Sequence, residues 1–211
     1  MTTPLIEKDS IVLFQGDSIT DAGRLAAGSS PLGGGYVNFA ASWFSALHPS
    51  LNVTFHNRGV SGERVKDLLV RWDADCIALK PDCVSILIGI NDTWRRYDSN
   101  DPTPVDVWER DYRKMLEITR EKLNAKILMM EPFVLPVPED RMAWREDLDP
   151  RIHAMRRLAR EFADVFVPLD GILAAAAMKR EPAYWAADGV HPTAAGHALI
   201  AQAWLKAVQA I

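Results

Sequence analysis

The fold of this chain follows from the segment Ile11-Val-Leu-Phe-Gln-Gly-Asp-Ser-Ile-Thr20. Its first four residues are apolar, which predicts a buried strand that ends at Gln15-Gly16. Because Gly16 allows a sharp turn and Asp17 can bond the turn's own amides, Ser18 projects its hydroxyl from a rigid platform. Open α/β sheets place their chemistry at the carboxyl ends of strands. We therefore predict a nucleophilic Ser18, although Gly-Asp-Ser alone is also typical of a plain turn.

Composition limits the possible classes of protein. The chain has 211 residues, of which 48% are apolar and 25% charged, so we expect one globular domain spanning residues 1–211. The net charge of -4 with scattered basic residues argues against a nucleic-acid partner. No apolar run approaches the ~20 residues of a membrane span, and the first ten residues lack the features of a secretion signal, so we expect a cytoplasmic protein with no membrane partner. Cys76 and Cys83 lack metal-ligand spacing and are expected to be free core thiols.

Five short apolar runs alternate with amphipathic segments, at residues 11–14, 53–56, 84–88, 126–130 and 165–169. Continuous apolar runs indicate strands that are covered on both faces. The segments between them predict helices over residues 36–47, 63–79, 104–123, 150–162 and 194–208. This alternation predicts a three-layer α/β/α sandwich around a five-stranded, mostly parallel sheet. Residues 133–149 are expected to be an irregular excursion that forms one wall of a pocket.

Two further segments lie at the carboxyl ends of predicted strands and could stabilise negative charge. In Asn57-Arg-Gly-Val-Ser-Gly-Glu63, the glycines let the backbone approach a ligand, and the amides that open the next helix favour an anionic oxygen. The alternative is a plain helix start capped by Ser61. In Ile88-Gly-Ile-Asn-Asp92, Asn91 can offer its amide N–H₂ to a developing negative charge, or can form an Asx turn.

Trp94 and Arg95 follow Asn91 closely in the sequence. Together they could form an apolar and hydrogen-bonding wall for a polar substrate. Simple packing at the surface is the alternative interpretation.

The last informative segment is Trp185-Ala-Ala-Asp-Gly-Val-His-Pro192. Gly189 lets the chain fold so that the carboxylate of Asp188 can accept the Nδ1–H of His191. That bond leaves Nε2 free to act as a base and stabilises the imidazolium once a proton has been taken. The remaining histidines are expected to be surface residues or to be satisfied in the core; they are His48, His56, His153 and His197.

In order and spacing, these four segments resemble the four sequence blocks of the SGNH hydrolases, which are also called GDSL esterases and lipases. The resemblance implies that Ser18 is the nucleophile, His191 the base and Asp188 the residue that orients it. It also implies an oxyanion hole made by the amides of Ser18 and Gly62 and the side chain of Asn91. The fold implied is the flavodoxin-like SGNH hydrolase fold. Ile19 stands where the name-giving motif has leucine, a departure expected to affect packing only.

Within that family, the segments starting at Asp17, Asn57 and Gly89 look most like those of bacterial intracellular acetylxylan esterases. This narrower resemblance implies deacetylation of acetylated xylo-oligosaccharides or related sugars through an acyl-enzyme on Ser18. It implies no metal and no cofactor, a small-molecule ester as partner, and a homo-oligomer. Asp17, Trp94 and Arg95 are then the candidate substrate-binding residues.

Three other functions stay open at this point. A thioesterase or lysophospholipase of the same fold would use the same residues but would need a long apolar acyl channel. A non-catalytic carbohydrate-binding protein would have no need for serine, histidine and aspartate in register. A nucleotide-binding flavodoxin-like protein is disfavoured, because the glycine-rich residues 28–35 form no phosphate loop.

Overall fold

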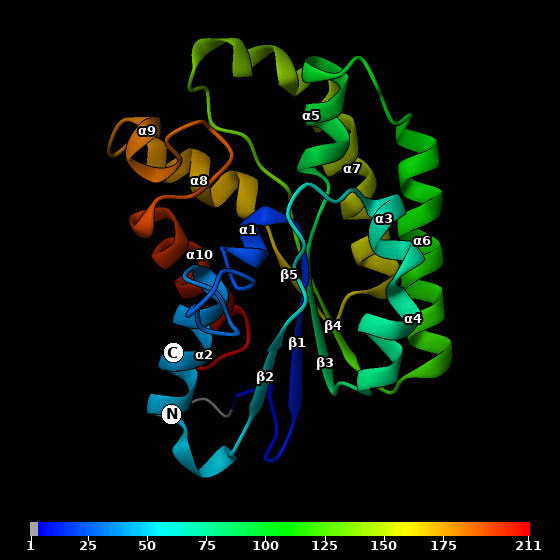
Figure 1. The fold of residues 1–211 in the computed structure, drawn as a ribbon, viewed down its shortest axis with the longest axis vertical. Coiled ribbons are helices and arrows are strands. Elements are labelled where there is room, and N and C mark those ends of the chain that lie inside the picture. Colours follow the sequence, from blue (N-terminus) through cyan, green and yellow to red (C-terminus); the bar gives the residue numbers. More distant parts are fainter. Residues whose placement is uncertain (1–3) are drawn as a thin grey trace.

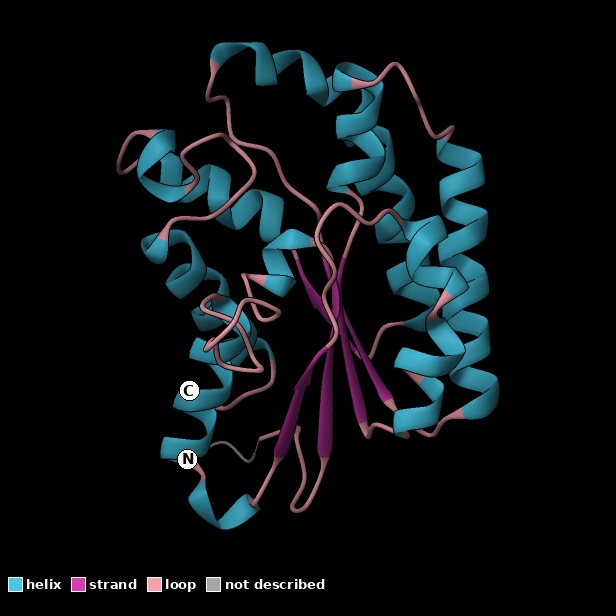
Figure 2. Cartoon of the chain, in the orientation of Figure 1, coloured by secondary structure: helices cyan, strands magenta, loops and turns pink. Residues whose placement is uncertain are grey.

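The computed structural model describes residues 4–211, and within that range five strands form one sheet in the order β2-β1-β3-β4-β5. Every neighbouring pair of strands is parallel (Figure 2). The strands are β1 (Ile11–Gly16), β2 (Thr54–Asn57), β3 (Cys83–Leu87), β4 (Lys126–Met130) and β5 (Val165–Val167). This order is the flavodoxin-like one, and the predicted parallel sheet is confirmed.

Helices cover both faces of the sheet (Figure 1). One layer contains α2 (Tyr36–Leu47), α8 (Leu169–Ala177), α9 (Pro182–Trp185) and α10 (Ala194–Ala207); the other contains α3 (Val65–Val70), α4 (Trp72–Asp75), α6 (Val105–Lys122) and α7 (Arg145–Phe162). Alternate side chains of β1 enter different cores: Val12 and Phe14 pack in one, and Leu13 packs in the other. Burial on both sides explains why the strands are continuous apolar runs.

The helix predicted over residues 63–79 is divided into three pieces. It consists of α3, α4 and a final 3₁₀ turn, η2 (Ile77–Leu79). The first break falls at Arg71, whose guanidinium binds the side chains of Gln15 at 3.1 Å and Glu63 at 2.7 Å. The contact with Gln15 joins Arg71 to a strand 56 positions away, so the periodicity of the segment could not reveal the break.

The segment after β4 is more ordered than predicted. Only its first residues are irregular, because a 3₁₀ helix, η3 (Glu139–Trp144), follows and α7 begins at Arg145 instead of residue 150. Pro150 lies inside α7 and removes one backbone hydrogen bond. Two ion pairs, each between residues one turn apart, lie next to this proline: Arg151–Asp147 spans it at 2.9 Å, and Arg145–Asp149 lies in the turn before it at 2.5 Å. They explain how the helix continues through it.

A further helix, α5 (Ile90–Asp98), was not predicted. It directly follows β3, where the sequence suggested a loop. Aspartate in its first turn and two arginines in its last turn match the helix dipole, a signal that sequence reasoning could have used.

The two ends of the described chain lie together, away from the carboxyl ends of the strands (Figure 1). The amide of Leu5 donates a hydrogen bond to the carbonyl of Val208 at 2.9 Å. Two short helical turns complete the elements: α1 (Ser18–Asp21) and η1 (Pro49–Leu51).

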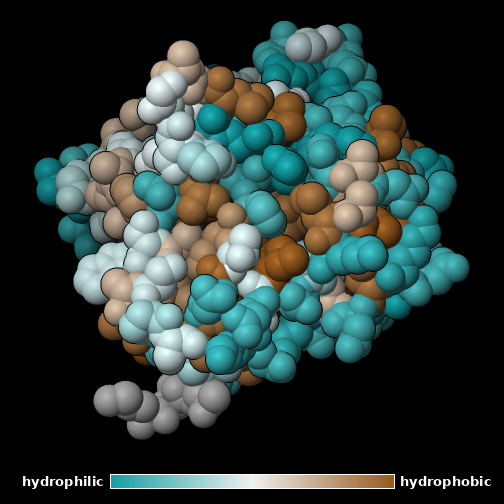
Figure 3. Space-filling view, turned by 60° about the horizontal axis from the view of Figure 1, so that its bottom comes forward, coloured by the Kyte–Doolittle hydropathy of each residue, from teal (hydrophilic) through white to brown (hydrophobic). Residues whose placement is uncertain are grey.

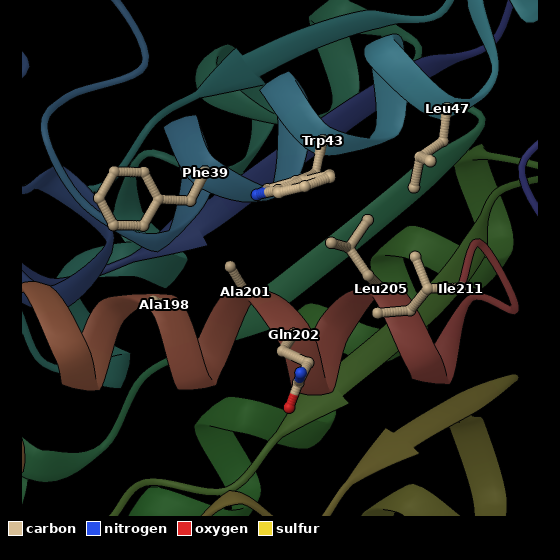
Figure 4. Close-up of a pocket in the computed structure, with 8 residues that line it drawn as sticks. All are labelled: Phe39, Trp43, Leu47, Ala198, Ala201, Gln202, Leu205 and Ile211. Atoms are coloured by element: carbon tan, nitrogen blue, oxygen red, sulfur yellow. The ribbon is translucent and has the colours of Figure 1, made fainter.

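Helices α2 and α10 leave an apolar groove of about 430 Å³ between them (Figure 4). We call it the α2/α10 groove; it is lined by Phe39, Trp43, Leu47, Ala198, Ala201, Gln202, Leu205 and Ile211. The side chain of Trp43 is 60% exposed. On the face shown in Figure 3, apolar side chains are mixed with hydrophilic ones. None of the helices formed by residues 4–211 combines the length and the apolar character that crossing a membrane requires.

Candidate active site

Three side chains predicted from two separate segments meet at the carboxyl edge of the sheet. The hydroxyl of Ser18 lies 2.9 Å from Nε2 of His191, although the two residues are 173 positions apart. Nδ1 of the same imidazole lies 2.7 Å from Oδ2 of Asp188. In this order a carboxylate holds the imidazole with Nε2 facing the hydroxyl, so the imidazole can take the hydroxyl proton and increase its nucleophilicity.

The turn that carries Ser18 is held in place by the two residues before it, Gly16 and Asp17. Oδ1 of Asp17 accepts the amide N–H of Ile19 at 3.0 Å and caps α1. Gly16 is required, because a β-carbon there would lie 2.3 Å from the carbonyl oxygen of Leu87. Asp17 is 1% exposed, so its position suits holding the serine turn, and the substrate-binding role predicted for it stays a prediction.

Burial also changes the acidity of Asp17. Desolvation raises the pKa of its carboxyl to about 7, against the opposing effects of the Ile19 amide and nearby His191. Its second oxygen, Oδ2, is buried without a hydrogen-bond partner. A protonatable group therefore lies directly behind the candidate nucleophile.

The loop that carries Asp188 and His191 is fixed at several points. Oδ1 of Asp188 accepts the amides of Val190 at 3.0 Å and His191 at 2.7 Å. Burial alone would raise the pKa of Asp188, but the hydrogen bonds from His191 and the two amides outweigh it and hold the pKa below its usual value. Asp188 therefore stays ionised beside the imidazole.

Gly189 joins this loop to the segment after β4. Its φ of +83° lies in the left-handed region, and a β-carbon there would lie 2.4 Å from the carbonyl oxygen of Val137. The amide of Leu135 donates to the Gly189 carbonyl at 2.8 Å. The close approach that glycine permits thus places the histidine relative to the sheet.

Gly62 and Asn91 lie on neighbouring segments that are bonded together. Gly62 has a φ of +84°, and Asn91 lies in the first turn of α5, where its Nδ2 donates to the Glu63 carbonyl at 3.0 Å. An amide nitrogen has two N–H groups, so this bond fixes the side chain and leaves a second donor. The loop therefore fixes the Asn91 side chain and leaves one of its N–H groups free to donate.

Asp92 is a residue at this site that sequence reasoning missed. It is fully buried, and its Oδ2 accepts the amide of Val65 at 3.2 Å, which gives α5 a second attachment next to the Gly62 loop. Desolvation raises its pKa to about 6, opposed mainly by Arg151. Only its position beside Asn91 in the sequence pointed to it.

The start of α3 also differs from the prediction. The helix begins at Val65 with Arg64 as its cap, three residues after Gly62, so Ser61 is not the cap. The hydroxyl of Ser61 instead donates to Oδ2 of Asp21 at 2.7 Å. The Gly62 amide therefore belongs to a loop before the helix and is not one of the helix's own terminal amides.

Trp94 and Arg95 face different parts of the site. The ring of Trp94 lies 5.6 Å from the ring of His191. Arg95 instead pairs with Asp98, and its Nη2 is 4.0 Å from where a β-carbon of Gly62 would be. The two residues predicted to form one wall therefore have different neighbours, Trp94 beside His191 and Arg95 beside Gly62.

Arg141 is the second site residue that the sequence did not reveal. Its Nε donates to the Asp188 carbonyl at 3.4 Å, and its guanidinium lies 5.4 Å from the ring centre of Trp94. It belongs to η3, within the segment that was expected to wall a pocket. The segment was identified correctly as a wall, but no local pattern marked this arginine.

His197 and His48 have the structural roles expected of them, because each bonds a backbone group. Nδ1 of His197 accepts the amide of Tyr36 at 3.1 Å, and burial lowers its pKa to about 4, so it is neutral at pH 7. Nε2 of His48 bonds the carbonyl of Ala210 at 2.9 Å. Cys76 and Cys83 are buried free thiols, as expected.

A serine, histidine and aspartate at the carboxyl edge of a parallel sheet define a hydrolase of the serine type. Residues 14–199 match the model of the GDSL-like Lipase/Acylhydrolase family, and the chain belongs to this family. It is accordingly a carboxylic ester hydrolase, as the sequence predicted.

Relatives of known structure support this classification. The chain is 37% identical to an acetylxylan esterase from Geobacillus stearothermophilus over 205 residues, or 93% of each chain. The crystal structure of Axe2, an acetylxylan esterase from the same organism, superposes with a TM-score of 0.87 at 35% identity, covering 96% of this chain and 95% of Axe2. A candidate GDSL-like lipase from Parabacteroides merdae gives a TM-score of 0.92 at 37% identity and 98% coverage of both chains.

Proposed function

We propose that this protein is a serine esterase that removes acetyl groups from acetylated xylo-oligosaccharides or related sugars through an acyl-enzyme on Ser18. The observation that carries the proposal is the continuous chain of hydrogen bonds from Ser18 through His191 to Asp188. A carbohydrate-binding protein has no use for such a chain, whereas an esterase depends on it.

The mechanism follows from these positions. His191 takes the proton of Ser18 as its oxygen attacks the ester carbonyl, and Asp188 stabilises the resulting imidazolium. The amides of Ser18 and Gly62 and the free N–H of Asn91 donate to the oxyanion as it forms. His191 then returns the proton to the leaving alcohol, and water activated by the same imidazole releases acetate from Ser18.

The relatives supply the argument for the reaction and the substrate. Three catalytic mutants of Axe2 replace one serine, one aspartate and one histidine by alanine, in the chain order in which Ser18, Asp188 and His191 occur here. Axe2 is also described as an acetyl-xylooligosaccharide esterase. Both facts support the roles and the sugar ester proposed for this chain.

The alternative of a thioesterase or lysophospholipase is less well supported. Those enzymes need an apolar channel for a long acyl chain beside the serine. The α2/α10 groove is apolar, but its lining includes none of the three reactive residues. The cavity beside His191 is instead lined by aromatic and charged side chains.

An ester panel tests the proposal directly. We expect acetylated xylo-oligosaccharides and simple acetyl esters to be hydrolysed, butyryl esters less well and octanoyl esters hardly at all. A fluorophosphonate should label Ser18 and no other serine, as peptide mass mapping would show. Preference for octanoyl esters, or labelling elsewhere, would contradict the assignment.

The expectations of a cytoplasmic location and a homo-oligomer stay predictions. Sedimentation velocity of the purified protein would test the second, and a monomer at micromolar concentration would count against it.

A further inference from the structure

A pocket of about 420 Å³ opens between α5 and η3. Its walls include Trp94 and Asp98 from α5 and Asp140, Arg141 and Trp144 from η3. This volume falls within the range of ~300–1,000 Å³ typical of small-molecule sites. We call it the α5/η3 pocket.

The α5/η3 pocket shares a wall with the reactive imidazole. The ring of Trp94, which lines the pocket, lies 5.6 Å from the ring of His191. Arg141, on the opposite wall, donates to the carbonyl of Asp188. A molecule in this pocket would therefore lie beside the histidine and not behind the serine turn.

The histidine side of such a site receives the alcohol half of an ester. In serine esterases the imidazolium returns its proton to the leaving oxygen, which must be within reach of Nε2. The carbonyl oxygen lies instead with the oxyanion donors, here on the Gly62 loop and Asn91. The location of the α5/η3 pocket next to His191 thus assigns it to the leaving group.

The lining of the pocket indicates the chemistry of that group. The guanidinium of Arg141 stacks 4.1 Å from the ring centre of Trp144 and pairs with Asp140 at 3.1 Å. Asp98 is paired with Arg95. Trp144 is itself only 2% exposed, so the pocket combines the ring of Trp94 with charges that are already neutralised in pairs.

A neutral sugar fits this lining better than the alternatives. An acyl chain would bury paired charges without hydrogen-bonding them, at a cost in desolvation. An anion would meet the carboxylates of Asp98 and Asp140. A pyranose offers a C–H face to the partly exposed ring of Trp94 and hydroxyls to the carboxylates and guanidinium.

We propose that the α5/η3 pocket binds a neutral pyranose ring of the leaving alcohol, with the ring of Trp94 as its platform. The inference rests on the proposed esterase function and adds to it the half of the substrate that sets specificity. It also assigns Arg141 to keeping the platform in place through its contacts with Trp94 and Trp144.

The test compares two acetyl esters that differ only in the alcohol: acetylated xylobiose and ethyl acetate. We expect Trp94→Leu to lower the ratio of kcat/KM for the sugar ester to that for ethyl acetate by about tenfold or more, because it removes the aromatic face. Trp94→Phe, which keeps a ring, should hold the ratio within about threefold. Trp43→Leu in the distant α2/α10 groove is the control and should leave both values of kcat/KM unchanged.

Inhibition by the product gives a second readout. Unacetylated xylobiose should inhibit ethyl acetate hydrolysis competitively, and the inhibition should weaken about tenfold in Trp94→Leu. The pocket assignment would be overturned if Trp94→Leu left both the kcat/KM ratio and the inhibition constant unchanged. It would also be overturned if the variant lost kcat/KM equally with both esters. The esterase function would stand in either case. Failure of the unmodified enzyme to hydrolyse either ester would instead refute the proposed function and the inference with it.

Discussion

The α2/α10 groove and the α5/η3 pocket have nearly the same volume, about 430 and 420 Å³, and opposite chemistry. The groove is lined by side chains such as Phe39, Trp43 and Leu205, none of which titrates (Figure 4). The pocket combines Trp94 with paired charges and lies against His191. Judged by apolar lining alone, the groove would be the default binding site.

The difference teaches that reactive groups, and not cavity size, locate this active site. The hydroxyl, imidazole and carboxylate that meet near the pocket come from two distant loops, and each is held by backbone hydrogen bonds or glycine turns. The groove has no comparable polar group fixed in place. If this is right, substitutions near the α5/η3 pocket should change esterase activity, and substitutions in the α2/α10 groove should not.

The largest effect is expected for Ser18→Ala. Loss of the nucleophile should lower kcat for p-nitrophenyl acetate by about 10⁶-fold, as in other serine hydrolases. The fold should be intact by circular dichroism, because Ser18 is only partly buried and its hydroxyl bonds the side chain of His191. Undiminished turnover would break the comparison, because the pocket side would then lack the nucleophile.

Asp17→Asn should change how stability depends on pH. Burial raises the pKa of Asp17 from 3.8 to about 7, so its contribution to stability is fully present below the unfolded pKa and is lost as pH rises through about 7. That loss is on the order of 4 kcal/mol. An asparagine is neutral at every pH, so the variant should lose less stability than the wild type between about pH 4 and pH 8. Urea unfolding at both pH values measures this, and identical losses in the two proteins would show that Asp17 stays ionised.

Asn91→Ala should lower kcat about 10²- to 10³-fold, equivalent to roughly 2.7–4 kcal/mol of transition-state stabilisation. KM should change much less, because the donor acts on charge that forms during the reaction. Steady-state kinetics with p-nitrophenyl acetate separates the two constants. An effect confined to KM would make Asn91 a substrate-binding residue and leave the oxyanion hole without a side-chain donor.

The smallest effect on stability and activity is expected for a substitution in the α2/α10 groove. Trp43→Ser should change the free energy of unfolding by no more than about 0.5 kcal/mol, because the side chain is 60% exposed. Its kcat/KM for acetyl esters should match that of the wild type. A clear loss of esterase activity would show that the α2/α10 groove takes part in the reaction and would erase the contrast between the two cavities.

The sequence identified those parts of the site that depend on local patterns. A buried strand before Gly16 placed Ser18, and the spacing of Asp188 and His191 placed a carboxylate beside an imidazole; both arrangements are present. The parallel sheet followed from continuous apolar runs. The residues that define each of these features lie within a few positions of one another, so a single sequence is enough to recognise them.

Features that depend on distant contacts were missed. Arg141 meets Asp188 across 47 positions, and Asp92 meets Val65 across 27, so neither partner marks the other in the sequence. The early start of α7 was hidden by Pro150, whose helix-breaking tendency is offset by one ion pair before it and one across it. The burial of Asp17 was missed for a similar reason, because burial cannot be read from a turn motif.

The hydrogen bond between Leu5 and Val208 suggests a way to build a sturdier catalyst. Since the two ends of the described chain lie away from α1, which begins at Ser18 (Figure 1), a short peptide could close the backbone into a ring without touching the reaction centre. Closing a loop of roughly 200 residues would restrict the unfolded chain and raise stability by about 5 kcal/mol in the ideal case. The circular enzyme would then tolerate more heat and resist exopeptidases, while turning over esters at the rate of the linear one.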